Sequence, residues 1–330
     1  IQYPAAFAAG ANGPDSLFCF EVWKSASKRR FDLPGLGNRM HEENTGAFLQ
    51  SLMKHVSTRP QVEYALGFLS HYATDTVMHP YVCALCQPGM PYAGPGGHGY
   101  FEIALDSTLH AEDTGVSLVP ADDTSPRMKG EELADVTTLL SRCLSEAYGL
   151  DIPVEYLADA FEDIYRLRSI FPSRTGVKKV FFTLVEPLFG GRGFITGHVS
   201  PRRLVPELPD QWTDPFTGEA RKGNAFALLR EAEKRSGIFM AGALEYWMGG
   251  ISEEQFFGLL GSMSYTEGRA TPLSDPALAA SPAQPQEGPA QPASRPEAAP
   301  AGEEEPSAPP AVQEKTETSA GGTADWTARP

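Results

Sequence analysis

Three side chains able to ligate a metal recur every four residues in the stretch HYATDTVMHP, residues 71–80. They are His71, Asp75 and His79, and the segment around them is rich in apolar residues. Helical positions four apart lie only about 40° apart around the axis, so the three would share one stripe. Imidazole and carboxylate groups are costly to bury without partners, but both can ligate zinc. The spacing therefore predicts a metal-binding face on a helix.

A second stretch, HGYFEIALD, repeats the same spacing with His98, Glu102 and Asp106. A Gly/Pro-rich loop at 87–97 separates the two stretches, so the two helices can pack antiparallel with their polar stripes facing. One such pair on a helix is more often a surface pair or a satisfied core histidine. Two successive triplets favour a metal site, in which Asp106 orients a ligand histidine from the second shell.

Two upstream residues are expected to complete this cluster. Asp15 follows a Gly-Pro turn, and alone it would be interpreted as a helix N-cap. His41 precedes the predicted helix at 45–57, and alone it would be interpreted as a loop residue. His110 continues the four-residue spacing, but it is rotated by about 120° from His98 and is predicted to lie on the surface.

Apolar periodicity predicts an all-α fold, a multi-helix bundle over residues 1–265. The run at 178–185 is compatible with a strand or with a buried helix. From residue 266 the composition shifts to Ala, Pro, Glu, Ser, Gln and Gly, which predicts a disordered tail over 266–330. The predicted helices cover 45–57, 60–87, 98–112, 129–147, 155–171, 224–247 and 252–263.

Composition excludes several classes of protein. The net charge of −15 argues against a nucleic-acid partner, which would need a basic surface. No apolar run reaches the ~20 residues of a transmembrane helix, so any membrane contact is expected to be transient. Four cysteines do not suggest a disulfide scaffold, and Cys83 and Cys86 are interpreted as ordinary small buried residues. No signal peptide is visible, which favours a cytoplasmic location over secretion.

These motifs resemble the zinc-dependent phospholipase C family, also described as the phospholipase C/D domain, in a bacterial branch. The resemblance spans roughly residues 1–250. It is carried by GPD at 13–15, GNRMHEENTGAFL at 37–49, GFLSHYATDTVMHPYV at 67–82, HGYFEIALD at 98–106 and WTDPFTGE at 212–219.

The resemblance implies an all-α bundle of the phospholipase C type that holds two zinc ions, with a third site left open. One zinc would be bound by His41, His71 and Asp75, and the second by His79, His98 and Glu102. Asp75 would bridge to the third zinc, and Asp15 resembles the acidic residue that activates water. The secreted enzymes place a longer segment between the residues equivalent to Asp75 and His79. No histidine precedes His41, so we expect this chain to lack the family's N-terminal helix.

The expected function is that of a zinc-dependent phosphodiesterase. It would hydrolyse a phospholipid or a related phosphodiester by phospholipase C-type attack of an activated water. The alternative is a non-catalytic zinc-binding helical module with a structural or binding role. Three aromatic residues, Tyr72, Tyr81 and Tyr92, could line a cage for a choline head group or could simply pack.

Overall fold

The computed structural model describes residues 1–173, 175–188, 193, 195–199 and 208–273. The chain divides into two units, residues 1–286 and 287–330, and only the first contains described residues. The predicted tail from residue 274 onward therefore lies outside the part of the chain that the structure describes.

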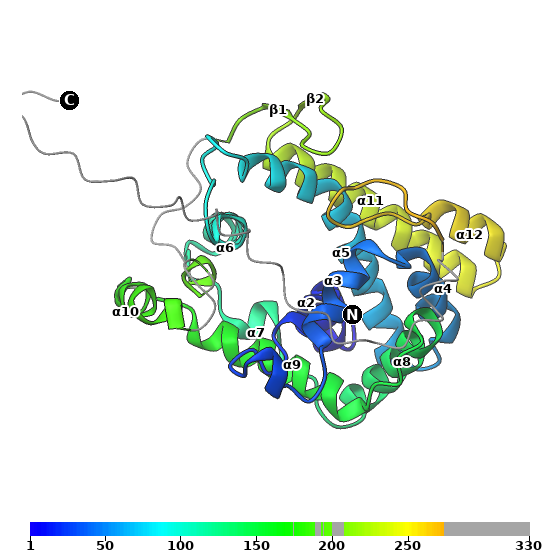
Figure 1. The fold of residues 1–330 in the computed structure, drawn as a ribbon. Coiled ribbons are helices and arrows are strands. Elements are labelled where there is room, and N and C mark those ends of the chain that lie inside the picture. The colour runs from blue at the N-terminus through cyan, green and yellow to red at the C-terminus, as the bar shows by residue number, and fades with distance from the viewer. Residues whose placement is uncertain (174, 189–192, 194, 200–207, 274–330) are drawn as a thin grey trace, which may run out of the picture. The chain divides into compact units, whose positions relative to one another are not determined.

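The described chain is all-α apart from one small hairpin (Figure 1), as the sequence predicts. The hairpin pairs β1 (Gln211–Thr213) with β2 (Ala220–Lys222) in antiparallel register. Short 3-10 helices occur at η1 (Ala26–Lys28), η2 (Glu186–Leu188) and η3 (Thr196–His198). The α-helices are α1 (Pro4–Ala11), α2 (Asp15–Phe18), α3 (Leu33–Glu42), α4 (Thr45–His55), α5 (Arg59–Leu85), α6 (Gly97–Thr114), α7 (Ala121–Thr124), α8 (Gly130–Tyr148), α9 (Val154–Ile170), α10 (Val177–Val185), α11 (Ala225–Trp247) and α12 (Glu253–Leu260).

Helix α5 is the central element of the fold, and α1 and α11 pack along it (Figure 1). Thr58 and Gln61 form a capping box at its start, which satisfies the first free N–H groups. Most of its residues are buried on all sides, as expected for a helix enclosed by others. Pro80 lies inside the helix and has no N–H to donate to the carbonyl of Thr76.

Helix α1 lies unusually close to α5 because glycines face each other across the contact. A Cβ on Gly10 would lie 2.0 Å from the carbonyl oxygen of Tyr64, and a Cβ on Gly67 would lie 2.1 Å from that of Phe7. Only glycine permits backbones to approach this closely. This contact fixes the chain just ahead of the GPD motif against the middle of α5.

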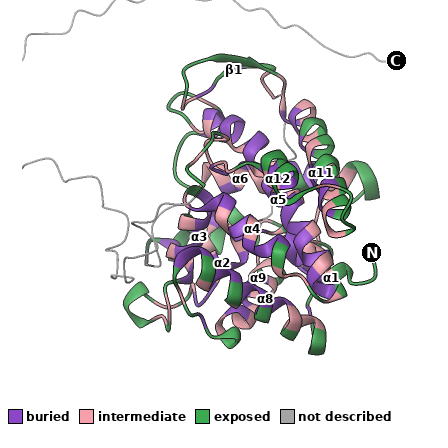
Figure 2. Cartoon of the chain, turned by 90° about the vertical axis from the view of Figure 1, so that its right-hand side faces the viewer, coloured by how far each residue is buried: buried purple, intermediate pink, exposed green. Residues whose placement is uncertain are grey.

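The buried apolar residues form two clusters, and α5 belongs to both. The larger cluster includes Phe68 and Leu69 of α5, and the smaller includes Val77 and Tyr81. The polar stripe of α5 lies where one cluster gives way to the other. Figure 2 shows buried positions on the inner helices and exposed ones on outer surfaces such as that of α11.

The seven predicted helices are confirmed as α4, α5, α6, α8, α9, α11 and α12, with ends shifted by a few residues. The run at 178–185 is helical, in α10. Four of the described helices were not predicted from the sequence: α1, α2, α3 and α7. Helix α1 is rich in alanine and carries little amphipathic pattern, α2 and α7 have only four residues each, and α3 contains a proline and two glycines in an otherwise amphipathic sequence. Helix α1 precedes the GPD motif, where no N-terminal helix was expected, and it carries no histidine.

The described chain remains hydrogen-bonded beyond residue 265, the predicted end of the domain, and the boundary between domain and tail stays a prediction. Residues 261–273, called the C-terminal strap below, fold back on themselves through a bridge between Met263 and Ala270. The Thr271 N–H donates to the carbonyl of Ser262 at 2.8 Å. Within the described chain, no helix has both the length and the apolar character needed to cross a bilayer.

Candidate metal centre

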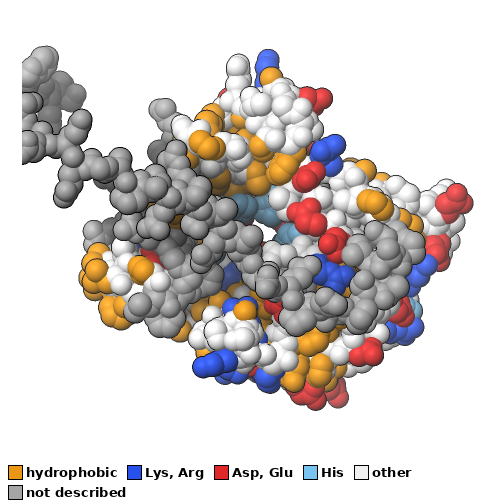
Figure 3. Space-filling model, in the orientation of Figure 1, with side chains coloured by type: hydrophobic (Ala, Val, Ile, Leu, Met, Phe, Trp, Pro, Cys, Tyr) orange, Lys and Arg blue, Asp and Glu red, His pale blue; other side chains and the backbone are white. Residues whose placement is uncertain are grey.

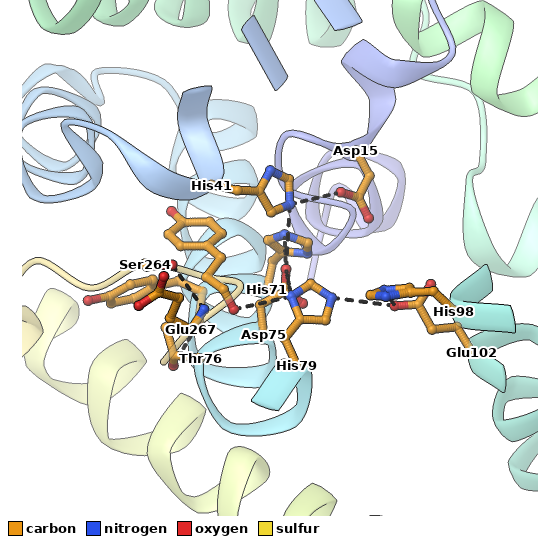
Figure 4. Close-up of polar contacts among 12 residues, drawn as sticks. Asp15, His41, His71, Asp75, Thr76, His79, His98, Glu102, Ser264 and Glu267 are labelled. Atoms are coloured by element: carbon orange, nitrogen blue, oxygen red, sulfur yellow. Dashed lines mark hydrogen bonds and ion pairs between the residues drawn. The ribbon is translucent and has the colours of Figure 1, made fainter. Parts of the chain in front are cut away.

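The first ligand group consists of Asp15, His41 and His71, which α2, α3 and α5 bring together (Figure 4). One potential ligand atom from each residue lies within 4.8 Å of the others. His41 Nε2 lies 3.3 Å from Asp15 Oδ1. The histidine side chains are only 9% and 6% exposed, whereas that of Asp15 is 42% exposed. Asp15 therefore closes this group on its solvent side.

The second ligand group consists of His79 of α5 with His98 and Glu102 of α6. The Glu102 carboxylate lies between the two imidazoles, with Oε1 at 2.9 Å from His98 Nε2 and 3.4 Å from His79 Nε2. His79 is 13% exposed, while His98 and Glu102 are each 44% exposed. The second ligand group thus opens to solvent through its α6 side.

Asp75 lies between the two groups. Its Oδ2 is 3.0 Å from His71 Nε2 and 3.7 Å from both His41 Nε2 and His79 Nδ1. A carboxylate has two oxygens and can reach two ions at once. Asp75 therefore faces both groups, while its predicted bridge to a third zinc and the assignment of individual ligands to individual ions stay predictions.

Backbone carbonyls orient two of the histidines. His41 Nδ1 donates to the carbonyl of Gly37 at 2.8 Å, and His79 Nδ1 donates to that of Tyr265 at 3.1 Å. A nitrogen that donates to a carbonyl carries the ring proton, so Nε2 of each ring keeps its lone pair for a ligand. Such partners fix the tautomer and the ring angle of metal-ligating histidines.

The second of these carbonyls belongs to the C-terminal strap. Tyr265 is fully buried, and its N–H donates to the carbonyl of His41 at 2.7 Å. Ser264 Oγ donates to Glu42 Oε2 at 2.6 Å. The strap therefore connects the end of α3 to the middle of α5. No pattern in the sequence around Tyr265 marks this role.

The GPD motif has a steric reason for its glycine. Gly13 has a φ of +52°, and a Cβ there would lie 2.1 Å from Cδ2 and 2.5 Å from Nε2 of His71. The backbone therefore passes directly against the imidazole. The turn places Asp15 beside His41 and leaves no room for a side chain at residue 13.

The donor set fits divalent zinc on two grounds. Imidazole nitrogens and carboxylate oxygens in groups of three, with open positions, are the ligands of catalytic zinc. In addition, His71 Nε2 is buried and makes no hydrogen bond of ordinary geometry, although it lies 3.0 Å from Asp75 Oδ2. A bound cation would satisfy this nitrogen, whose burial is otherwise unfavourable.

The charges in the metal-free protein compensate one another. Burial raises the pKa of Asp75, but the neighbouring His71 and His79 outweigh it and hold that pKa at about 2. Burial lowers the pKa values of His79 and His98, but Asp75 and Glu102 raise that of His79 to about 10, and Cys83 and Glu102 raise that of His98 to about 10. Imidazolium groups thus neutralise the carboxylates, in the places where metal ions would act.

The structure also gives the positions of Asp106, His110 and the three tyrosines named from the sequence. Asp106 is exposed, and among the described residues no hydrogen bond or ion pair joins it to a ligand histidine, so its orienting role has no support. His110 lies away from both groups and contacts Asp123 at 3.5 Å. The three tyrosines are buried, which favours packing over a choline cage: Tyr72, Tyr81 and Tyr92.

Two residues near the second ligand group were not singled out from the sequence. The Cys83 thiol, one turn after His79 on α5, hydrogen-bonds to His98 and helps to raise the pKa of that imidazole. Cys83 and Cys86 are both partly exposed and unbridged, rather than buried as expected. His198 lies over the next turn of α6, since a Cβ on Gly99 would lie 2.7 Å from its Cε1.

Fold and site together define a helical protein with two candidate metal-binding groups, both of which include a histidine of the central helix α5. Residues 1–150 match the family model described as zinc dependent phospholipase C. This part of the chain contains both ligand groups, and it belongs to the zinc-dependent phospholipase C family. No curated protein and no solved structure matches the chain.

Proposed function

We propose that the protein is a zinc-dependent phosphodiesterase that hydrolyses the phosphodiester bond of a phospholipid, as a phospholipase C does. Family membership supports a zinc-dependent, phospholipase C-like role. The observation that carries the proposal is the pairing of two ligand groups around Asp75, each open to solvent on one side. Structural zinc sites are closed by four protein ligands, whereas catalytic sites keep a position free for water or substrate.

In this proposal the two groups hold two zinc ions. Bound zinc lowers the pKa of water and neutralises the charge that develops on a phosphodiester. The third ion suggested by the resemblance has no separate group of three ligands among the described residues.

The chain's own residues then have distinct tasks. Asp15, on the open side of the first ligand group, accepts a proton from the attacking water. The water oxygen bonds to phosphorus as the bond from phosphorus to the diacylglycerol oxygen breaks, and that oxygen takes a proton from solvent. Asp75 holds the two groups in register, and the carbonyls of Gly37 and Tyr265 keep His41 and His79 aligned.

A zinc measurement combined with a turnover measurement tests the proposal. We expect about two zinc ions per chain, hydrolysis of a water-soluble chromogenic phosphodiester, loss of hydrolysis on chelation and recovery on zinc addition. An Asp15→Asn variant should lose most turnover even at zinc concentrations that saturate both ligand groups. Full zinc content without turnover on any phosphodiester would instead identify the non-catalytic zinc-binding module.

A further inference from the structure

Helix α10 presents an apolar stripe to solvent. Val177, Val180, Phe181 and Leu184 are 67%, 65%, 59% and 75% exposed. Their spacing of three, one and three residues places them on one face of the helix, called the α10 face below. A surface helix normally turns such a stripe toward the core, so this exposure calls for a partner surface.

The opposite side of α10 is attached to the protein, so the orientation of the helix is fixed. Phe182 packs edge-on against Phe171, with ring centroids 6.1 Å apart. Lys179 Nζ lies 4.2 Å from the ring centroid of Tyr100, on α6. The apolar stripe therefore points outward because other residues of the same helix make the inward contacts.

The charge around the α10 face is positive, although the chain carries a net charge of −15. Lys178 is exposed beside the stripe, whereas Lys179 is turned inward against Tyr100. The one acidic residue among described positions 170–188 is Glu186, and it is 2% exposed. Its carboxylate accepts hydrogen bonds from Gly193 and Thr196. The exposed side of this segment thus combines apolar and cationic groups, as interfacial helices do.

Packed aromatic rings connect the inward side of α10 with the second ligand group. Phe171, which contacts α10 through Phe182, also stacks on His198 at 6.4 Å between ring centroids. His198 in turn lies against Gly99, next to His98. In Figure 3, apolar side chains gather over α10 at the left, and histidine side chains are visible in a hollow on the same side of the molecule.

We propose that the α10 face docks the protein on an anionic phospholipid bilayer, so that head groups reach the metal centre beside it. The inference rests on the proposed function in naming the substrate as a lipid in a bilayer. Burial of the apolar stripe supplies most of the affinity, and the exposed Lys178 adds attraction to anionic lipid. Such contact is reversible, because one short helix buries little area.

The test compares vesicle binding with hydrolysis of a soluble substrate, using the full chain. The variant is Phe181→Glu with Leu184→Glu, and the matched control is Ile238→Glu with Leu244→Glu. The control residues are exposed apolar positions on α11, which packs against α5 and α12. All four positions are exposed, so both variants should fold, which thermal melting checks.

We expect the α10 variant to bind vesicles containing phosphatidylglycerol at least about tenfold more weakly than wild type. It should hydrolyse vesicle phospholipid correspondingly more slowly and a soluble chromogenic phosphodiester at the wild-type rate. The control should match wild type in all three measurements. A Lys178→Gln variant should lose most of the preference for phosphatidylglycerol over phosphatidylcholine vesicles.

Unchanged vesicle binding by the α10 variant, or an equal loss in the control, would overturn the inference. Wild-type hydrolysis of the soluble diester without vesicle binding would also overturn it while leaving the proposed function intact. The zinc-loaded protein could also bind vesicles in a way that depends on Phe181 and Leu184 but hydrolyse no phosphodiester. That result would support the docking surface and contradict the proposed enzymatic function.

Discussion

Replacing Gly13 by alanine should remove zinc from the first ligand group without changing any ligand. The added Cβ would lie 2.1 Å from His71 Cδ2, so the imidazole must retreat by about 0.9 Å to reach the 3.0 Å limit of real contacts. His71 is buried, and its ring has little room to move. Ligand distances in zinc sites hold to within about 0.2 Å, so a shift of this size breaks the coordination geometry.

The matched control is Gly249→Ala. Gly249 has a φ of +75°, comparable with the +52° of Gly13, but a Cβ there meets nothing within 4 Å. Both variants carry the backbone penalty of alanine in the left-handed region, about 1 kcal/mol. The difference between them therefore isolates the contact with His71.

Zinc affinity, measured by competition with a chromophoric chelator, should fall about 10- to 100-fold at one site of Gly13→Ala and stay unchanged in Gly249→Ala. At saturating zinc, this loss of affinity corresponds to about 1.4 to 2.7 kcal/mol of lost stabilisation, so Gly13→Ala should have a lower Tm than Gly249→Ala. The difference in Tm between the two variants should narrow after a chelator removes the zinc. Turnover should fall by about 100-fold. Equal zinc content and equal Tm in the two variants would refute the steric account of the GPD motif.

Three further predictions concern charge. Asp75→Asn should reduce zinc from about two ions per chain to one or fewer, as measured by atomic emission. Asp106→Asn, which changes an exposed carboxylate on α6, should keep its zinc, and equal loss in both variants would contradict the position of Asp75 between the two groups. His79 and His98, whose pKa values are raised to about 10, are protonated at neutral pH in the metal-free protein. Zinc binding should therefore release about two protons, and zinc affinity should increase as the pH rises toward 10. Calorimetry in buffers of different ionisation enthalpy counts the released protons. Burial raises the pKa of Glu21, but hydrogen bonds from Lys24 and Arg30 outweigh it and lower that pKa to about 2. The carboxylate therefore contributes up to about 3 kcal/mol to the free energy of unfolding above about pH 4.5, and this contribution is lost as the pH falls toward 2. Glu21→Gln should remove this part of the acid sensitivity in denaturant titrations.

The stripes of α5 and α6 could be predicted because helical periodicity is local and visible in the sequence. The same geometry explains why the polar stripe of α5 contributes to two ligand groups. His79 lies eight positions after His71 and is rotated by about 80° from it, which suits a different group, with Asp75 between them. Asp106 is rotated equally far from His98, and it is exposed and belongs to neither ligand group.

The parts that could not be predicted depend on distant contacts. The carbonyl that orients His79 lies 186 residues away at Tyr265, in a segment assigned to the disordered tail or its edge. Helix α3 was missed because its glycines favour loops, although tertiary packing buries Leu36 and Met40 and makes the helix stable. Cys83 and His198 approach the site only through the packing of α5, α6 and η3.

The position of Tyr265 has a consequence for the order in which the protein matures. A chain is synthesised from its N-terminus, and its early segments fold first. All six members of the two ligand groups have been made by residue 102, yet the carbonyl that aligns His79 arrives only with residue 265. A nascent chain can thus gather the ligands before it can align them. Competence for chemistry is therefore acquired late, when the last described segment closes over a bundle that is already folded.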